Sequence, residues 1–317
     1  ENKNMIIKER EIAGKTMRLE TGRVARQSNG SVMVTYGETT ILAAVNAANE
    51  PREDIDFFPL QVEYRDKHYA GGKIPGGFFK REARPSEHEV LTSRVTDRPI
   101  RPLFPKGFKN ETQIMITVLQ SDGENMADVL AGVGASAALI TSTIPWNGPI
   151  ASVRVGRIEG KYIINPTRSE IMDCDLEMVV SGNQETVVMV EGEADGVTES
   201  EVLDGLKQAH EVIKEIIDLQ NELLSAMDVV KDEVVIPQPD DAMVSAVDEK
   251  IGSQVDDIVK IVDKKERSSA KNELVSSILD SLEESYPSEG KTIKSLIDDR
   301  FKAGFREQIL ATGKRSD

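Results

Sequence analysis

The spacing of apolar residues changes once along this chain, near residue 235, and this change constrains the fold more than any other feature. Before it, short runs rich in Val, Ile and Thr are bounded by Gly, Asn, Asp or Pro, as is typical of β-strands. After it, apolar residues recur only at helical spacing. A chain of 317 residues is also too long for one typical core. We therefore predict a mixed α/β domain over residues 1–235, a hinge at Val234–Pro239, an all-helical domain over 240–311 and a linker-like end at 312–317.

Eight strands are predicted in the first domain, and two turns join strands into hairpins. Gly37 and Glu38 form the first predicted turn, and Glu159-Gly160 leads into a further short strand at Lys161–Ile164. The other predicted strands are Ser31–Tyr36, Thr40–Val45, Phe57–Tyr64, Thr112–Gln120, Ile150–Ile158, Leu176–Ser181 and Thr186–Glu191.

Helices are predicted from caps, breakers and apolar spacing. Ser86 and Glu89 form a capping-box pattern that opens a helix running to about Arg98, where Pro99 and Pro102 are expected to stop it. The stretch 126–142 is full of Ala and Gly, which predicts a helix packed very closely on a sheet. The remaining predicted helices are 198–227, Asp241–Ile251, Val255–Lys264, Ser268–Tyr286 and Thr292–Leu310.

The net charge of −16 argues against a nucleic-acid partner, but it hides one basic stretch. Between Tyr64 and Lys109 there are eleven basic and five acidic residues, a local excess of six positive charges. Such a footprint fits an anionic ligand, and the alternative is a solvated charged face. The sequence has no apolar run long enough to cross a membrane and does not begin like a signal peptide. Its single cysteine excludes an intrachain disulfide, so a reducing cytoplasm is the simplest expectation.

The most specific feature of the basic stretch is a glycine-flanked loop. Gly71-Gly72 and Gly76-Gly77 precede Phe78-Phe79-Lys80-Arg81. Two adjacent aromatic rings in such a loop can stack on bases while the neighbouring cations hold phosphates, which is how single strands are bound without sequence preference. The alternative is that one ring fills a core and the other a subunit interface.

Three arginines follow the loop. Arg94 and Arg98 are four residues apart on the predicted helix and so share one face, and Arg101 comes just after it. Guanidinium groups that converge suit phosphates. The alternative is pairing with an acid such as Glu87 or Asp97.

Other candidates for chemistry are weaker. The three histidines lie far apart, without the spacing of metal ligands. Asp173, Asp175 and Glu177 form a short acidic cluster that either binds Mg²⁺ or is simply solvated. The glycine loop lacks the Lys-Ser/Thr ending of a P-loop. Cys174 has no activating base nearby in sequence and is expected to be inert.

These motifs together resemble the bacterial polynucleotide phosphorylases. The resemblance rests on Gly76–Glu87 and Arg94–Pro105, supported by Leu19–Arg26, Gly134–Leu139 and Ile164–Thr167, and it extends over essentially the whole chain. It implies that the first domain is an α/β core of the RNase PH type, with a mixed sheet and packed helices, followed by a small all-α domain.

The resemblance also implies an activity. Members of that family use inorganic phosphate to remove nucleoside diphosphates from the 3′ end of single-stranded RNA, reversibly, in the cytoplasm and alongside the RNA-degradation machinery of mRNA turnover. They form homotrimeric rings through which the RNA threads. The carried-over RNA-binding residues are Phe78, Phe79, Lys80, Arg81, Arg94 and Arg98. Lys80 stands where arginine is common, so the charge is kept but the planar fork is lost.

The resemblance further implies that this portion holds no catalytic residue and no metal ligand. In the family, catalysis and Mg²⁺ binding belong to a second core, which is expected to begin near Asp317 and to be followed by KH and S1 modules. The Gly-Ser-Ser turn that meets phosphate reads Gly123-Glu124-Asn125 here, and the Asp-x-Lys pair reads Glu177-Met178-Val179. We expect a role in RNA guidance and ring assembly. The alternatives are a binding module, an assembly half whose phenylalanines pack between subunits, and a stand-alone RNase PH-like enzyme.

Overall fold

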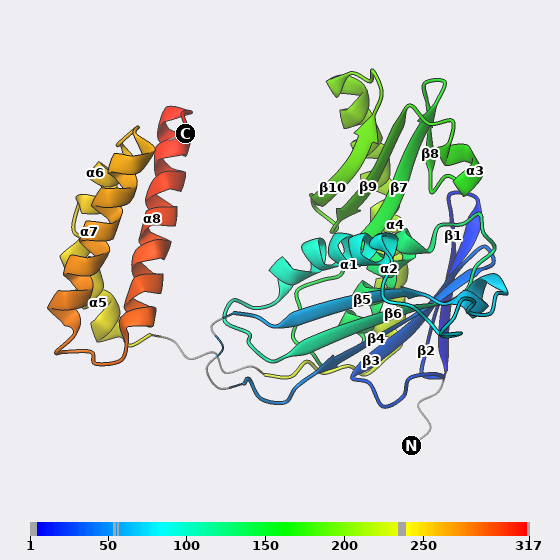
Figure 1. Ribbon diagram of the computed structural model, residues 1–317, viewed down its shortest axis with the longest axis horizontal. Coiled ribbons are helices and arrows are strands. Elements are labelled where there is room, and N and C mark those ends of the chain that lie inside the picture. Colours follow the sequence, from blue (N-terminus) through cyan, green and yellow to red (C-terminus); the bar gives the residue numbers. More distant parts are fainter. Residues whose placement is uncertain (1–4, 53–54, 56, 234–238, 316–317) are drawn as a thin grey trace. The chain divides into compact units, whose positions relative to one another are not determined.

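The computed structural model describes residues 5–52, 55, 57–233 and 239–315. The chain divides into two compact units, Glu1–Val235 and Ile236–Asp317, which are drawn in Figure 1. Most of the predicted hinge, residues 234–238, lies outside the described residues. None of the helices in the described part combines the length and the apolarity that a bilayer crossing needs.

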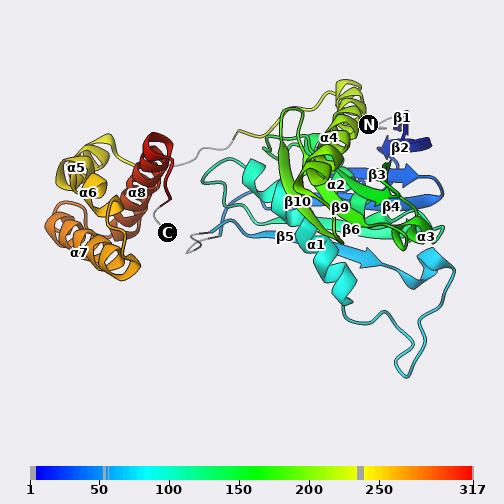
Figure 2. The same cartoon turned by 90° about the horizontal axis from the view of Figure 1, so that it is seen from above.

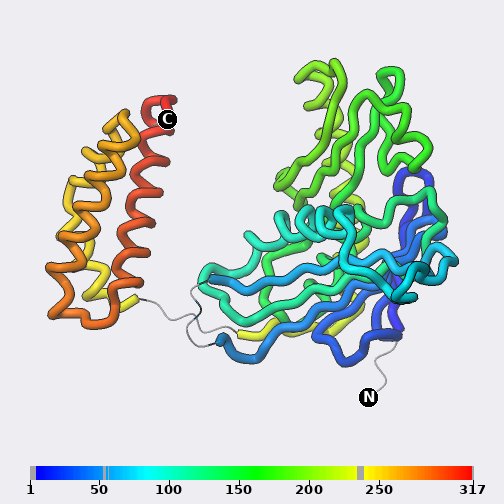
Figure 3. Tube along the Cα trace, in the orientation of Figure 1, coloured from blue at the N-terminus to red at the C-terminus, as the bar shows by residue number. Residues whose placement is uncertain are grey.

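Two sheets form the frame of the first unit, and Figure 3 traces the chain from the blue strands of one to the green strands of the other. The first sheet is mixed, because β5 and β6 are parallel and its other neighbouring pairs are antiparallel. The second sheet is antiparallel. The first sheet has the order β1 (Ile6–Ile12), β2 (Lys15–Thr21), β3 (Gly30–Tyr36), β4 (Thr39–Ala47), β6 (Thr112–Gln120) and β5 (Leu60–Asp66), and the second has the order β10 (Val187–Ala194), β9 (Leu176–Gly182), β7 (Ala151–Ile158) and β8 (Lys161–Ile164).

Most strand predictions are confirmed, and so are both hairpin turns. Three strands differ from the prediction. β1 and β2 were not predicted, because charged residues are interleaved with their few apolar ones. The strand expected from Phe57 begins only at Leu60, as β5.

The helix α2 (Ala127–Ile140) lies between the two sheets and is buried over nearly its whole length. It contacts β3 and β4 of the first sheet and β7 of the second. A Cβ on Gly132 would lie 2.3 Å from Ser152 Oγ of β7, and one on Gly134 would lie 2.9 Å from Ile41 Cδ1 of β4. The prediction that small residues serve close packing is therefore confirmed, with one glycine facing each sheet.

A closed ring of buried hydrogen bonds joins α2 to the long helix α4 (Glu199–Ser225) and to the segment that enters β7. Ser136 Oγ donates to Gln220 Oε1 over 2.7 Å, Gln220 Nε2 donates to the Ile150 carbonyl over 2.8 Å, and the Ile150 N–H donates back to Ser136 Oγ over 3.0 Å. Ser136, Gln220 and Ile150 are fully buried. Without these hydrogen bonds their polar atoms would be left unpaired, which would lower the free energy of unfolding.

The helix α1 (Glu87–Ile100) begins at the predicted capping box, in which Ser86 and Glu89 bond each other's backbone. The expectation that Pro99 stops the helix is wrong. Pro99 lies within its last turn, and the chain then tightens into the short 3₁₀ helix η2 (Arg101–Leu103). A proline so near the end removes one backbone hydrogen bond but leaves the preceding turns intact.

The second unit consists, over its described residues, of the helices α5 (Asp241–Ile251), α6 (Gln254–Val259), α7 (Lys264–Leu282) and α8 (Gly290–Thr312). They enclose a separate apolar core that includes Val247, Ile278, Ile297 and Phe301. The helix predicted over Val255–Lys264 is instead divided. Asp263 caps a new helix by accepting hydrogen bonds from the backbone of Lys265 and Glu266, so α7 begins at residue 264.

We expect Gly132→Val to lower the free energy of unfolding of the first unit by about 1–3 kcal/mol, the usual cost of overpacking. Urea unfolding followed by fluorescence measures this unit alone, because Trp146 is the chain's one tryptophan. Gly71→Val is the control, since an added Cβ at Gly71 meets nothing within 4 Å. Equal losses in both variants would contradict the close packing of α2.

Candidate nucleic-acid interface

The middle of the basic stretch folds as a long loop that leads into α1. After β5, the 3₁₀ helix η1 (His68–Gly71) is followed by residues 72–86, which contain no helix or strand. Figure 2 shows this segment in cyan, projecting from the body of the first unit. We refer to residues 72–86 as the aromatic loop.

Phe78 and Phe79 lie in the middle of the aromatic loop and are 95% and 75% exposed. Their rings pack edge to face against each other, with centroids 5.4 Å apart and planes at 86°. Gly77 and Lys80, which flank them, have left-handed backbone angles of +71° and +47°, so the chain turns sharply at this point. The idea that one ring fills this unit's core is therefore wrong, while packing at a subunit interface stays open.

The cations of the aromatic loop are free to meet an anion. Lys73, Lys80, Arg81 and Arg84 are exposed, and their side chains make no hydrogen bond or ion pair with any other described residue. Each therefore keeps its charge available for a phosphate. An exposed aromatic pair among unpaired cations has the composition of a single-strand binding surface.

The three arginines after the loop have different environments. Arg94 is exposed on α1 and pairs with no other described residue. Arg98 lies one turn later and is paired with Glu191 of β10, although both side chains remain half exposed. Arg101 is fully engaged, since it bonds Asp97 over 2.6 Å and 2.9 Å and the carbonyls of Phe58 and Leu60 over 3.1 Å each.

Arg101 therefore does not converge with Arg94 and Arg98, and its alternative, pairing with Asp97, is confirmed. Arg94 and Arg98 share the exposed face of α1 as their spacing predicts.

The backbone N–H groups of the turn at Gly123-Glu124-Asn125 are bound by side chains of the two residues that precede it. The Asp122 carboxylate accepts hydrogen bonds from the backbone N–H of Glu124 over 2.9 Å and of Asn125 over 2.7 Å. Burial alone would raise the pKa of Asp122, but these bonds and that of the Asn125 side chain outweigh it and lower the pKa to about 2. The Gly123 N–H donates to Ser121 Oγ. A phosphate would have to displace all of these bonds.

A buried arginine occupies the neighbouring strands. Arg154 of β7 is 8% exposed and pairs with Asp128 in the first turn of α2 and with Glu177 of β9. Asp175 pairs with Arg157 over 3.2 Å. The Mg²⁺ interpretation of the acidic cluster thus lacks geometric support, because two of its three carboxylates are bound by arginines and no group of three possible metal ligands converges among the described residues.

One cluster was missed from the sequence. Tyr64 of β5 donates to Asp66 Oδ1 over 2.7 Å, and His88 Nε2 of α1 lies 3.7 Å from Asp66 Oδ2, beside a hollow of about 450 Å³. Burial raises the pKa of Asp66, and the bond from Tyr64 and the nearby His88 oppose that rise. Strand alternation signals that Tyr64 and Asp66 share a face, but nothing in the sequence brings α1 to them.

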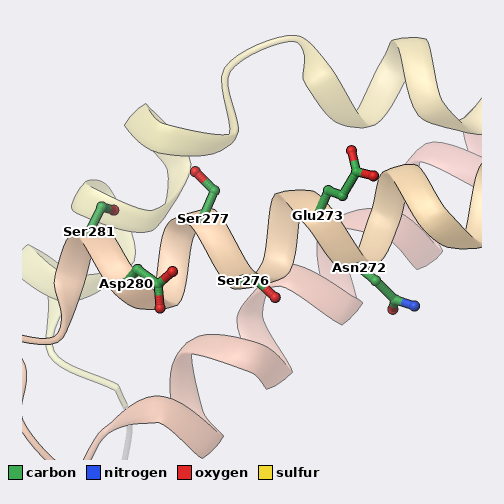
Figure 4. A pocket seen from close by; sticks show the side chains of 6 residues that line it. All are labelled: Asn272, Glu273, Ser276, Ser277, Asp280 and Ser281. Carbon is green, nitrogen blue, oxygen red and sulfur yellow. The ribbon is translucent and has the colours of Figure 1, made fainter.

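The helical unit has a shallow polar hollow along α7 (Figure 4). Its charged members, Glu273 and Asp280, are acidic, and they repel a phosphate backbone. The other side chains lining it are Asn272, Ser276, Ser277 and Ser281. The candidate interface is therefore the aromatic loop with the exposed face of α1.

Comparison with known families agrees with the division between the two sheets. The model of the 3′ exoribonuclease family, domain 1, matches residues 13–145, and that of domain 2 matches residues 148–212. The chain belongs to the 3′ exoribonuclease family. The boundary between the domains falls between α2 and the first strand of the second sheet.

Curated relatives of this family member are polyribonucleotide nucleotidyltransferases. That of Desulfosudis oleivorans is 44% identical over 96% of this chain, that of Thermomicrobium roseum 43% over 98%, and that of Syntrophomonas wolfei 44% over 99%. The resemblance to polynucleotide phosphorylases is thus confirmed. The chain spans 43%, 41% and 45% of these relatives' own lengths, which is less than half of each.

The fold agrees with a solved structure as well. The crystal structure of rice (Oryza sativa) Rrp46 matches 65% of this chain and 93% of that chain, with a TM-score of 0.53 and 16% sequence identity. At that identity the likeness concerns the fold alone. Together with the two family models, it confirms the predicted mixed α/β core of the RNase PH type.

We expect Arg154→Met to lower the free energy of unfolding of the first unit by about 3–5 kcal/mol, because two carboxylates are left buried without a partner. Neutralising them in Arg154→Met/Asp128→Asn/Glu177→Gln should recover most of this loss. Urea unfolding followed by Trp146 fluorescence measures both. The control is Arg98→Met, since breaking an exposed pair costs about 1 kcal/mol or less. A loss no larger than the control's would show that Arg154 does not neutralise these acids.

Proposed function

We propose that this chain is the RNA-guiding portion of a polyribonucleotide nucleotidyltransferase, which degrades single-stranded RNA from its 3′ end to nucleoside diphosphates with inorganic phosphate. The reaction is reversible, so the enzyme also polymerises nucleoside diphosphates. The proposal draws on the relatives at 43–44% identity, which carry that name. Catalysis lies in a second core of the same protein, which binds Mg²⁺ and phosphate.

The observation that carries the proposal is the exposed pair Phe78 and Phe79 among unpaired cations. Two rings kept in water at a sharp turn gain little from this unit's own packing, whereas stacking each base is worth roughly 1–3 kcal/mol. Lys80 and Arg81 follow at once and hold the phosphates on either side. Because every base has a flat face, this contact is independent of sequence, as a degradative enzyme requires.

The exposed face of α1 continues the path. Arg94 is available for a backbone phosphate. Arg98 binds a phosphate after it releases the carboxylate of Glu191. Such an exchange costs little, because both side chains are half exposed and water screens their attraction.

Ring assembly explains why the basic residues are concentrated. Outside the stretch 64–109 the chain has an excess of twenty-two acidic residues, which repels RNA. In a homotrimer whose aromatic loops line a central pore, the acidic exterior and the basic lining of the pore together favour threading of one RNA strand. The enzyme acts in the cytoplasm, in association with the RNA-degradation machinery.

The engaged turn at Gly123-Glu124-Asn125 and the paired Arg154 support a portion without its own phosphorolytic site. An active site needs donors that are free to bind the attacking phosphate. Here the backbone N–H groups of Glu124 and Asn125 already bind Asp122. The carboxylate of Glu177 already binds Arg154.

A second candidate is an assembly role, which the exposure of the phenylalanines also favours. Apolar rings that are solvated in one subunit are typical of surfaces that a second subunit covers. In that case Phe78 and Phe79 would pack between subunits and would not touch RNA.

We expect Phe78→Ala/Phe79→Ala to weaken binding of a fluorescent oligo(A) by at least about ten-fold, since each lost stack is worth roughly 1–3 kcal/mol. Raising the salt concentration should weaken binding in both proteins. The control is Ile74→Ala, an exposed aliphatic residue of the same loop.

Sedimentation velocity separates the two candidates. An unchanged oligomer with weakened RNA binding supports the stacking role of Phe78 and Phe79. Dissociation of the oligomer with unchanged affinity per subunit supports the assembly role instead.

Phosphorolysis itself is tested with poly(A), phosphate and Mg²⁺. We expect release of ADP by the protein that includes the second core and none by the 317-residue chain alone. Release by the chain alone would favour the stand-alone enzyme and contradict the proposed division. No release by either would contradict the proposed activity.

A further inference from the structure

Apart from its two ends, the aromatic loop is tied to the rest of the described unit at a single side chain. Between residues 74 and 85, the only hydrogen bonds to other described residues are those of the Glu82 carboxylate. Glu82 Oε1 accepts the backbone N–H of His68 over 3.2 Å, and Glu82 Oε2 lies 2.9 Å from His68 Nδ1. Both oxygens therefore bind one residue on the opposite arm of the loop.

His68 is itself held in place. It begins η1, whose buried Ala70 accepts the backbone N–H of Ser121 at the end of β6 over 2.9 Å. The backbone N–H of Lys73 also donates to the His68 carbonyl over 2.9 Å. The contact between Glu82 and His68 thus ties the returning arm of the loop to a turn anchored on the sheet.

The charge state of Glu82 agrees with this tie. Hydrogen bonding to the His68 side chain is the largest of the effects that lower the pKa of Glu82, with further help from the His68 backbone and Lys67. The carboxylate is therefore ionised at neutral pH and acts as an acceptor with both oxygens.

We propose that Glu82 is a positioning residue, which through His68 holds Phe78 and Phe79 in place for RNA. This inference rests on the proposed function. A loop that is ordered before binding loses less conformational freedom when the RNA arrives, so it binds more tightly than an untied loop with the same rings and cations.

The sign of the effect separates positioning from simple electrostatics. Glu82 is an acid among the cations of the aromatic loop, next to Arg81 and close in sequence to Arg84. Removing a negative charge from a surface that binds a polyanion should by itself strengthen binding. Loss of the contact between Glu82 and His68 should instead weaken RNA binding.

The test compares the binding of fluorescent oligo(A) by the 317-residue chain and by Glu82→Ala. We expect an affinity about three- to ten-fold weaker in the variant, the factor that corresponds to ordering one or two side chains. Glu82→Gln keeps an acceptor for the His68 N–H and should lose less. The matched control is Glu211→Ala, which removes an exposed glutamate bound to Lys214 on α4 and should change nothing.

Two further readouts distinguish positioning from general damage. Hydrogen exchange of residues 74–85 should be faster in Glu82→Ala, with or without RNA, while exchange in α2 stays unchanged. In the Phe78→Ala/Phe79→Ala background, Glu82→Ala should cause no further loss of affinity, because the tie then has no rings to position.

The outcomes separate this inference from the proposed function. If the double phenylalanine variant binds more weakly but Glu82→Ala binds as well as the unchanged chain or better, the positioning role is overturned and RNA guidance stands. An equal loss from Glu82→Ala with and without the rings also overturns it. If removing the rings leaves affinity unchanged, RNA guidance by the aromatic loop fails and the inference fails with it.

Discussion

The burial of α2 between two sheets is the constraint on which the rest of the first unit depends. Both faces of this helix must approach a sheet closely, so its composition is almost entirely small or apolar and it has no exposed face of its own. Its N-terminal end carries Asp128, which binds Arg154, and follows the turn closed by Asp122. That turn adjoins Ser121, whose backbone N–H donates to Ala70 of η1, the element that leads into the aromatic loop. The packing of one buried helix thus decides where the exposed loop begins.

The fold divides its cations into two classes, and under the proposed function this division lets an acidic chain hold RNA. Arg154 and Arg157 are paired with carboxylates inside the unit, where an unpaired charge would be costly, and Arg101 is paired with Asp97 at its surface. The cations of the aromatic loop are exposed and pair with no other residue that the structure describes, so they remain available for an anion. Glu82 is the one acidic residue of the aromatic loop. A single-stranded RNA would therefore be attracted to this loop and repelled by the acidic remainder of the chain.

Sequence patterns predicted the elements whose signals are local. The limits of β6 and α5, the capping box of α1 and the close packing of α2 follow from alternation, helical spacing, caps and small residues. The sequence did not predict β1 and β2, whose apolar residues are interrupted by charges, nor the hydrogen bonds of Arg101 to two carbonyls more than forty residues away. The cluster of Tyr64, Asp66 and His88 likewise exists only because α1 packs on β5. Such contacts depend on tertiary packing, which local spacing does not specify.

The central claim, that Phe78 and Phe79 stack on RNA bases, is tested most directly by photocrosslinking. An oligonucleotide that carries 5-iodouridine is bound, irradiated and digested, and the crosslinked residue is located by mass spectrometry. The account predicts that crosslinks concentrate at Phe78 and Phe79 and disappear when unlabelled poly(A) competes. Competable crosslinks confined to other parts of the chain, with none in the aromatic loop, would contradict it.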